Sequence, residues 1–151
     1  KPLYNVAYRY VWNGQQAQDV VHDAFLELWA RRATVVTATA DRYVWTSVLN
    51  YARKRRRWNQ LRSFLHADDD EAAKEVSAQS AECEVMHAET GTTLQQAIDA
   101  LPPKLREVLL LTAFSEMSYD AIAEMLAIPP GTVASRRHLA LQRLRQELQS
   151  R

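Results

Sequence analysis

Polar and basic side chains gather near the end of this 151-residue sequence in a pattern suited to reading DNA. They follow the breaker Pro129-Pro130-Gly131 at helical spacing: Thr132, Ser135, Arg136 and Arg143. At the start of a helix such side chains reach base edges in the major groove, and arginine can form two hydrogen bonds with guanine. The pattern predicts the second helix of a helix-turn-helix, with Arg136 reading a base. A plain helical bundle whose arginines face solvent is the alternative.

A second basic block lies in the first half, where aromatic side chains precede a run of arginines. Residues 42–62 carry seven basic side chains and no acidic one, and the block itself reads Arg53-Lys54-Arg55-Arg56-Arg57-Trp58. Aromatic rings beside arginines suit single-stranded nucleic acid, because bases stack on the rings while arginines hold the backbone. Two alternatives remain open. Trp45 could be a core residue, and Arg55 to Arg57 could hold phosphates without reading sequence.

Acidic side chains recur at every fourth position along a third segment. Asp19, Asp23 and Glu27 would share one face of a helix, with Arg31 one turn beyond Glu27 as its partner. Apolar residues repeat on the neighbouring face: Val20, Val21, Ala24, Phe25, Leu28 and Trp29. This period predicts an amphipathic helix, with Phe25 and Leu28 assigned to the core.

Helices must position all these residues, because apolar residues recur at helical spacing along most of the chain. Asn13-Gly14 is predicted to end a first helix that begins at Pro2. Residues 33–40, with three threonines and two valines, are predicted to form a loop. Helix starts are predicted at Asp41, at Ser118 and at Pro130. Along the last helix we expect these residues to face inward: Val133, Ala140, Leu141, Leu144 and Leu148.

Charge divides the chain into three parts. Residues 66–93 carry eight acidic residues against Lys74 alone, whereas basic residues gather before and after them. Three glycines and an abundance of Ala, Leu, Arg and Glu favour an all-α protein. We therefore predict two small helical domains, residues 1–64 and 94–151, joined by a flexible acidic linker, residues 65–93.

Several classes of function find little support in the sequence. No apolar run approaches the ~18 residues that a membrane span needs, so membrane insertion is not expected. A lone Cys83 fits a reducing cytoplasm, and because the sequence begins with Lys1 in place of Met, we expect the natural N-terminus to lie further upstream. With no glycine-rich phosphate loop or nucleophile motif, we predict neither an enzyme nor a cofactor. Cys83 and His87 lie one helical turn apart, but without further ligands nearby we predict no metal site.

Three motifs of the last third resemble region 4 of the extracytoplasmic-function (ECF) sigma factors, group IV of the main bacterial sigma factor superfamily. They are Leu101-Pro-Pro-Lys-Leu-Arg-Glu-Val-Leu-Leu-Leu, Ser118-Tyr-Asp-Ala-Ile-Ala-Glu-Met-Leu and Gly131-Thr-Val-Ala-Ser-Arg. In the first half, Ala17-Gln-Asp-Val-Val-His-Asp-Ala-Phe-Leu-Glu-Leu-Trp resembles region 2.2. Tyr43-Val-Trp-Thr-Ser-Val-Leu-Asn, followed by arginines, resembles regions 2.3 and 2.4. The resemblance covers nearly the whole chain except the linker.

The resemblance implies a factor that directs core RNA polymerase to promoter DNA and is often held inactive by an anti-sigma factor. Polymerase binding is carried over to the positions Asp19, Asp23, Glu27 and Trp29. Region 2 contact with the minus-ten element is carried over to Tyr43, Trp45, Asn50, Arg53, Arg55, Arg56 and Arg57. The loop at residues 33–41 would hold a flipped base, and the acidic linker would run toward the active centre and RNA exit path. Region 4 contact with the minus-thirty-five element is carried over to Thr132, Ser135, Arg136 and Arg143.

Some residues depart from the family pattern. Ala121 stands where glutamate would complete a capping box, and Ala134 and Leu139 replace frequent basic residues. Arg137 replaces a usual leucine, so we expect it to extend outward from the core edge. The family's first helix is absent. Two alternatives remain: a helix-turn-helix regulator whose first half senses a ligand or protein, and a sigma-like adaptor that binds polymerase without reading promoters.

Overall fold

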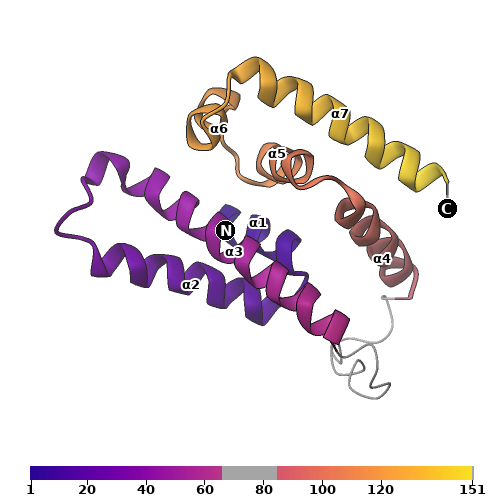
Figure 1. Ribbon diagram of the computed structural model, residues 1–151, viewed down its shortest axis with the longest axis horizontal. Helices are drawn as coiled ribbons and strands as arrows, with labels where there is room; N and C mark the ends of the chain where they lie inside the picture. Colours follow the sequence, from indigo (N-terminus) through magenta and orange to yellow (C-terminus); the bar gives the residue numbers. More distant parts are fainter. Residues whose placement is uncertain (66–84, 151) are drawn as a thin grey trace.

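The computed structural model describes residues 1–65 and 85–150, which contain helices and no strand. In chain order the elements are α1 (Pro2–Val11), α2 (Gly14–Ala30), the 3-10 turn η1 (Thr37–Thr39), α3 (Ala40–Leu65), α4 (Val85–Ala100), α5 (Pro103–Phe114), α6 (Tyr119–Leu126) and α7 (Pro130–Gln149). The all-α prediction is confirmed. Figure 1 shows α1, α2 and α3 on one side of the molecule and α5, α6 and α7 on the other.

The first three helices form a bundle around a core of aliphatic side chains. Val6 from α1, Val20 from α2 and Val48 from α3 are fully or almost fully buried in it. One face of α3 is buried in this core: Val44, Trp45, Val48, Leu49 and Ala52. Burial of such a face stabilises the helix more than its own propensity does. Helix α3 thereby holds its other face, which carries the arginine block, in a fixed position.

The helix starts of the second half follow from local sequence. Ser118 caps α6, its Oγ accepting a hydrogen bond from the Ala121 N–H at 3.2 Å. Ala127 then ends α6 in the left-handed conformation, with φ 53°. Pro130 occupies the first turn of α7, where its missing N–H is not needed. The predicted starts at Ser118 and Pro130 are therefore confirmed.

Two predicted boundaries in the first half are displaced by one or two residues. Helix α1 ends at Val11 and its cap Trp12 is left-handed, with φ 52°. Asn13 instead begins α2, because its side chain accepts a hydrogen bond from the Gln16 N–H at 2.9 Å. Asp41 does not precede α3 but lies in its first turn, since α3 begins at Ala40. Residues 31–39 contain turns and η1, which agrees with the predicted loop.

Several side chains assigned to the core are exposed. Phe25 is 49% exposed, whereas Leu28 packs against the core as expected. On α7, Val133 and Ala140 are buried, but Leu141 and Leu148 are exposed. Arg137 is exposed, which agrees with the expectation that it extends outward.

The predicted linker lies mostly outside the described residues, as do Cys83 and the acidic run of residues 68–75. Helix α3 ends at Leu65, and α4 begins at Val85, nine residues before the predicted start of the second domain. Helix α4 packs against α7. Neither described part of the chain contains a helix long and apolar enough to span a membrane.

The two halves of the chain pack against each other. One core cluster runs from Val6 and Tyr10 of α1 to Val108 and Leu111 of α5. Helices α1 and α5 are in contact, and the Arg9 guanidinium lies 5.0 Å from the centre of the Phe114 ring. The apolar contact between the halves is made by α1 and α5. Charged residues of α3 face the second half beside this contact.

Candidate nucleic-acid interface

The helix-turn-helix candidate consists of α6 and α7. At the start of α7, Thr132 is half-buried and Ser135 is exposed, with the Ser135 Oγ donating a hydrogen bond to the Thr132 carbonyl at 3.2 Å. Arg143 is exposed two turns further along α7. These side chains share one side of α7, and the first two lie in its N-terminal half, where they can reach the edges of bases in a major groove.

Arg136, the predicted base-reading residue, lies in a groove between the two halves. The groove has a volume of about 380 Å³. Its lining comes from α3 on one wall and from α5 to α7 on the other: Thr46, Leu49, Arg53, Lys104, Glu107, Met125, Leu126, Ile128 and Arg136. Arg136 is half-buried there, so it faces α3 in this arrangement and not open solvent.

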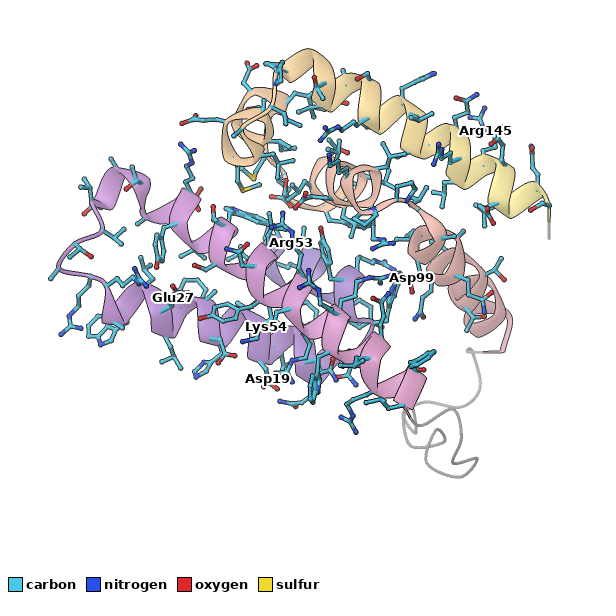
Figure 2. The ribbon with its side chains drawn as sticks, in the orientation of Figure 1. Asp19, Glu27, Arg53, Lys54, Asp99 and Arg145 are labelled. Atoms are coloured by element: carbon cyan, nitrogen blue, oxygen red, sulfur yellow. The ribbon has the colours of Figure 1, made fainter. Side chains whose placement is uncertain are left out.

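The predicted DNA-binding arginines of α3 divide into two groups. Arg53 forms an ion pair with Glu107 of α5 and also contacts Asn50 at 3.1 Å. Arg56 forms an ion pair with Asp99 of α4 at 2.5 Å. Arg55 and Arg57 form no ion pair with another described residue. Figure 2 shows Arg53 on the side of α3 that faces the second half.

Basic side chains are concentrated in a second cleft, of about 220 Å³, beside the first. Arg53, Arg56 and Arg57 line it from α3, and Lys104 and Arg106 line it from α5. The guanidinium of Arg106 is buried, and this burial lowers its pKa, with repulsion from Arg56 acting in the same direction. Burial also raises the pKa of Tyr10, although the neighbouring arginines oppose that shift. Glu107 also lines the cleft and pairs with Arg53, and Asp99 pairs with Arg56, so carboxylates neutralise part of this crowded cationic cluster.

The aromatic side chains of the predicted nucleic-acid site are less available than expected. Trp45 is 5% exposed in the core of the first bundle, so it cannot stack on a base in this arrangement, and that assignment is corrected. Its position at the inward period of α3, together with Val44 and Val48, explains the burial. Tyr43 is half-buried, and its hydroxyl donates a hydrogen bond to Glu27 at 2.8 Å.

The acidic line on α2 does not act as one surface. Asp19 accepts a hydrogen bond from Gln15 at 3.2 Å, and Asp23 is exposed. Glu27 turns toward α3, where it binds Tyr43 and also lies 3.6 Å from the Arg31 guanidinium, the partner expected for it. Figure 2 shows Asp19 directed away from the molecule and Glu27 near α3. Glu27, which was predicted to bind polymerase, and Tyr43, which was predicted to contact DNA, therefore bind each other in the structure.

Glu27 should make stability depend on acid pH. Hydrogen bonds from Tyr43 and Tyr51 hold the pKa of Glu27 below its ordinary value of 4.5. The unfolded chain therefore takes up a proton at a higher pH than the folded chain. This contribution to stability is complete above about pH 5 and is lost as the pH falls through the folded pKa.

We expect Glu27→Gln to flatten the acid side of the stability profile, measured as the free energy of unfolding in urea between about pH 3 and 6. Asp23→Asn, a change of the same kind at an exposed position of α2, should leave the slope as it is. An unchanged slope for Glu27→Gln would contradict the assigned role of the two tyrosines.

An apolar surface surrounds the C-terminal end of α2. Trp29 is 67% exposed and Leu26 is 53% exposed. A groove of about 390 Å³ separates this end from the start of α3, and it is lined by Phe25, Leu28, Trp29, Arg32, Val35, Thr37 and Ala40. The Arg32 guanidinium lies 4.6 Å from the centre of the Trp29 ring and donates a hydrogen bond to the Trp29 carbonyl. A cluster of large exposed apolar side chains of this kind is suited to contact with another protein.

Sequence reasoning missed the charged residues that join the two halves. They are Arg42, Asp99, Glu107 and Glu124. Each looks like an ordinary solvent-facing charge in a helical pattern, and its partner lies 43 or more positions away. The buried Arg106 was also missed, and it binds the carbonyls of Ile98, Asp99 and Leu101 within the second half. Among the described residues, no group of three or more His, Cys, Asp or Glu side chains could hold a metal ion.

Family comparisons match both halves of the chain. Residues 1–62 match the family described as Sigma-70 region 2, and residues 92–144 match Sigma-70, region 4. The first match contains α1, α2 and nearly all of α3. The second contains most of α4, all of α5 and α6, and α7 as far as Leu144.

Curated relatives align along almost the whole chain. The RNA polymerase sigma-H factor of Pseudomonas aeruginosa is 31% identical, over 93% of this chain and 77% of that protein. The ECF RNA polymerase sigma factor SigW of Bacillus subtilis is 28% identical, over 97% of this chain and 82% of that protein. The ECF RNA polymerase sigma factor SigE of Mycolicibacterium smegmatis is 29% identical over 97% of this chain, which spans 57% of that protein's length.

Two solved structures share the fold. CnrH, determined in complex with the cytosolic domain of CnrY, has a TM-score of 0.66 and 22% identity, over 99% of this chain and 81% of that one. The sigma factor RpoE, in complex with the anti-sigma factor NepR from Bartonella quintana, has a TM-score of 0.63 and 22% identity, over 97% of this chain and 89% of that one. The helical arrangement of this chain is therefore similar to theirs.

Proposed function

This chain belongs to the ECF sigma factor family, and we propose that it binds core RNA polymerase and selects promoters through two separate DNA-contacting surfaces. One observation carries the proposal. The arginine face of α3 and the helix-turn-helix of α6 and α7 lie on the two segments that match sigma region 2 and region 4. A ligand-sensing regulator would need neither the arginine face nor the apolar end of α2, so that alternative is not favoured.

The first surface, on α3, would hold the minus-ten element. Asn50 and Arg53 contact each other on it, and Arg56 and Arg57 line the same cleft as Arg53 nearer the end of the helix. Arg55 instead lines a groove beside α2. Arginine guanidinium groups bind phosphates through two hydrogen bonds, which suits a separated strand. Tyr43, close to the loop of residues 31–39, would contact a base after it is released from Glu27.

The second surface, on α7, would read the minus-thirty-five element. Thr132, Ser135 and Arg136 lie within the first two turns of α7, where a recognition helix contacts bases. Arg143 lies further along the same helix and suits a phosphate contact. Ala134 and Leu139 are exposed where basic residues are frequent in the family, so this surface offers fewer phosphate contacts.

Core polymerase would bind the apolar end of α2. Trp29 is its most exposed large side chain, and Asp23 on the same helix is also free to contact a partner. Glu27 is a weaker candidate, because its carboxylate is held by Tyr43 and Arg31. The sigma factor RpoE was solved with an anti-sigma factor, and we assign a partner of this kind to this chain as well. Since promoters are transcribed inside the cell, we place the protein in the cytoplasm, where its contribution is binding and not catalysis.

Transcription in vitro tests the proposed function directly. Core polymerase, the purified chain and a library of promoter sequences should give transcripts that share a minus-ten and a minus-thirty-five element. Core polymerase alone should not give them. A regulator of another kind would change transcription only with a second sigma factor present, and an adaptor would bind polymerase without enriching any promoter.

Arg136→Ala should relax promoter choice at one position of the minus-thirty-five element. Loss of an arginine that binds guanine through two hydrogen bonds costs about 1–3 kcal/mol of discrimination. The measurement is the enrichment of each base at each position of the same promoter library. Arg145→Ala, an exposed arginine that Figure 2 shows near the C-terminal end of α7, is the control. Equal losses on all sequences would mean that Arg136 holds only phosphate.

A further inference from the structure

We propose that three carboxylates of the second half occupy the phosphate-binding positions of α3, so that nucleic acid and the second half compete for the same arginines. The arginines are Arg42, Arg53 and Arg56, and their partners are Glu124 of α6, Glu107 of α5 and Asp99 of α4. The inference rests on the proposed function for the identity of the competing polyanion, a nucleic-acid strand.

The three arginines form one stripe along α3. Arg53 lies eleven positions after Arg42, and Arg56 lies three positions after Arg53, so all three project from nearly the same side of a helix with 3.6 residues per turn. The stripe is about 21 Å long at 1.5 Å per residue. Thr46 and Leu49 lie between these arginines on the same side and face the second half across the groove. A straight row of guanidinium groups of this length suits an extended phosphate backbone.

Each arginine of the stripe meets a different helix of the second half. Arg42 binds Glu124 twice, through the carboxylate at 2.8 Å and the main-chain carbonyl at 3.1 Å. Arg53 binds the carboxylate of Glu107. Figure 2 shows Arg53 and Asp99 on facing sides of the boundary between the halves.

The third pair is the most enclosed. The Arg56 side chain is 11% exposed, and the Asp99 carboxylate also accepts a hydrogen bond from the Trp12 indole at 3.3 Å. By contrast, the Arg42 and Glu124 side chains are 52% and 71% exposed. Water and salt therefore weaken the pair at α6 more than the pair at α4. A competing strand would enter the groove from the side of α6, where the contact is weakest.

Carboxylate and phosphate oxygens make the same kind of hydrogen bond with guanidinium groups. An arginine that binds one of them is not available to the other. Arg136 of α7 lies in the same groove, so closure by the three ion pairs also keeps the recognition helix turned toward α3. Separation of the halves would free both DNA-contacting surfaces together.

Neutral replacements of two carboxylates test the competition. We would compare the double variant Asp99→Asn and Glu107→Gln with a control of equal charge, Glu116→Gln and Glu147→Gln, whose carboxylates make no ion pair in the described part of the chain. Both keep the size of each side chain. Small-angle X-ray scattering of the full chain should show a larger radius of gyration for the first variant only. An unchanged radius would overturn the proposal.

Binding to a labelled oligothymidine of about 20 nucleotides supplies the second measurement. Release of two partly exposed ion pairs should tighten binding about fivefold at low salt. The slope of the logarithm of the binding constant against the logarithm of the salt concentration should also steepen, by roughly 0.7 per freed arginine or about 1.4 in total. On duplex DNA of equal length the corresponding change is roughly 0.9 per freed arginine. The two DNA forms thus identify which strand geometry the stripe prefers. An expanded variant with unchanged affinity and slope would also overturn the proposal.

Exchange of the charges of one ion pair distinguishes opening of the chain from misfolding. Glu107→Arg alone should expand the chain, because it places two cations opposite each other. Arg53→Glu combined with Glu107→Arg should restore the compact radius and abolish the gain in DNA affinity that opening gives. Circular dichroism checks that helix content is retained. If the wild-type chain failed to support transcription in vitro, the proposed function would fall, whereas the compaction measurements would still decide whether the ion pairs hold the halves together.

Discussion

Arg106→Met is expected to lower the free energy of unfolding by about 3 kcal/mol, the larger of two effects that follow from the arrangement of the helices. Arg106 is 7% exposed, and its guanidinium donates three hydrogen bonds to main-chain carbonyls. The acceptors are the carbonyl oxygens of Ile98, Asp99 and Leu101, at 3.0, 2.7 and 2.6 Å. A thermal midpoint lower by about 6–12 °C is the corresponding calorimetric change for a chain of this length.

The reason lies in the end of α4. The last carbonyls of a helix have no partner within it, and burial without a donor is costly. Arg106 supplies those donors from the first turn of α5, while Leu101 N–H also reaches the Ile98 carbonyl at 3.2 Å. Methionine would leave the Asp99 and Leu101 carbonyls without that donor. Each lost hydrogen bond to a charged group is worth about 1.5–3 kcal/mol, and relief from burying a cation offsets part of the total.

Arg106→Lys separates charge from hydrogen bonding. A lysine keeps the positive charge but cannot span three carbonyls with the fixed geometry of a guanidinium group. We therefore expect an intermediate loss, measured by urea unfolding at neutral pH. If the methionine variant were as stable as the wild type, burial of the cation would cost as much as its hydrogen bonds contribute, and Arg106 would not be a stabilising residue.

Local signals in the sequence predicted much of the fold. The period of Val44, Val48 and Ala52 identifies the buried side of α3, because residues four positions apart share one face of a helix. Ser118 begins α6 for an equally local reason, as its hydroxyl caps the free N–H groups of the first turn. Asn13 shows the limit. It can end one helix or cap the next, and its hydrogen bond with Gln16 selects the second role.

The candidate site was less predictable, because its residues meet across the boundary between the halves. Arg53 belongs to a basic block that suits nucleic acid, and nothing near it in sequence indicates Glu107 as a partner. Likewise, Phe25 fits the apolar period of α2, yet no element covers it in the described part of the chain. The apolar period of a helix identifies side chains that favour burial, whereas tertiary packing decides which of them another element actually buries.

Trp29→Ala should weaken binding of core RNA polymerase by about 30-fold or more. Exposed tryptophans at the centre of protein interfaces commonly contribute at least about 2 kcal/mol, which corresponds to that factor. Trp29 is 67% exposed at the end of α2, beside the exposed side chains of Phe25 and Leu26. Its removal should leave the free energy of unfolding almost unchanged, because little of the side chain is buried.

Trp58→Ala is the matched control for that prediction. Trp58 is 54% exposed, but it lies on α3 in a different groove, lined by Val20, Tyr51 and Leu61 among others. Fluorescence polarisation of the labelled chain titrated with core polymerase would give both affinities. A loss confined to Trp29→Ala assigns polymerase binding to the apolar end of α2. Equal losses in both variants would indicate general damage to the first bundle, and no loss at Trp29 would move the polymerase-binding surface elsewhere, with the acidic residues of α2 as the next to be tested.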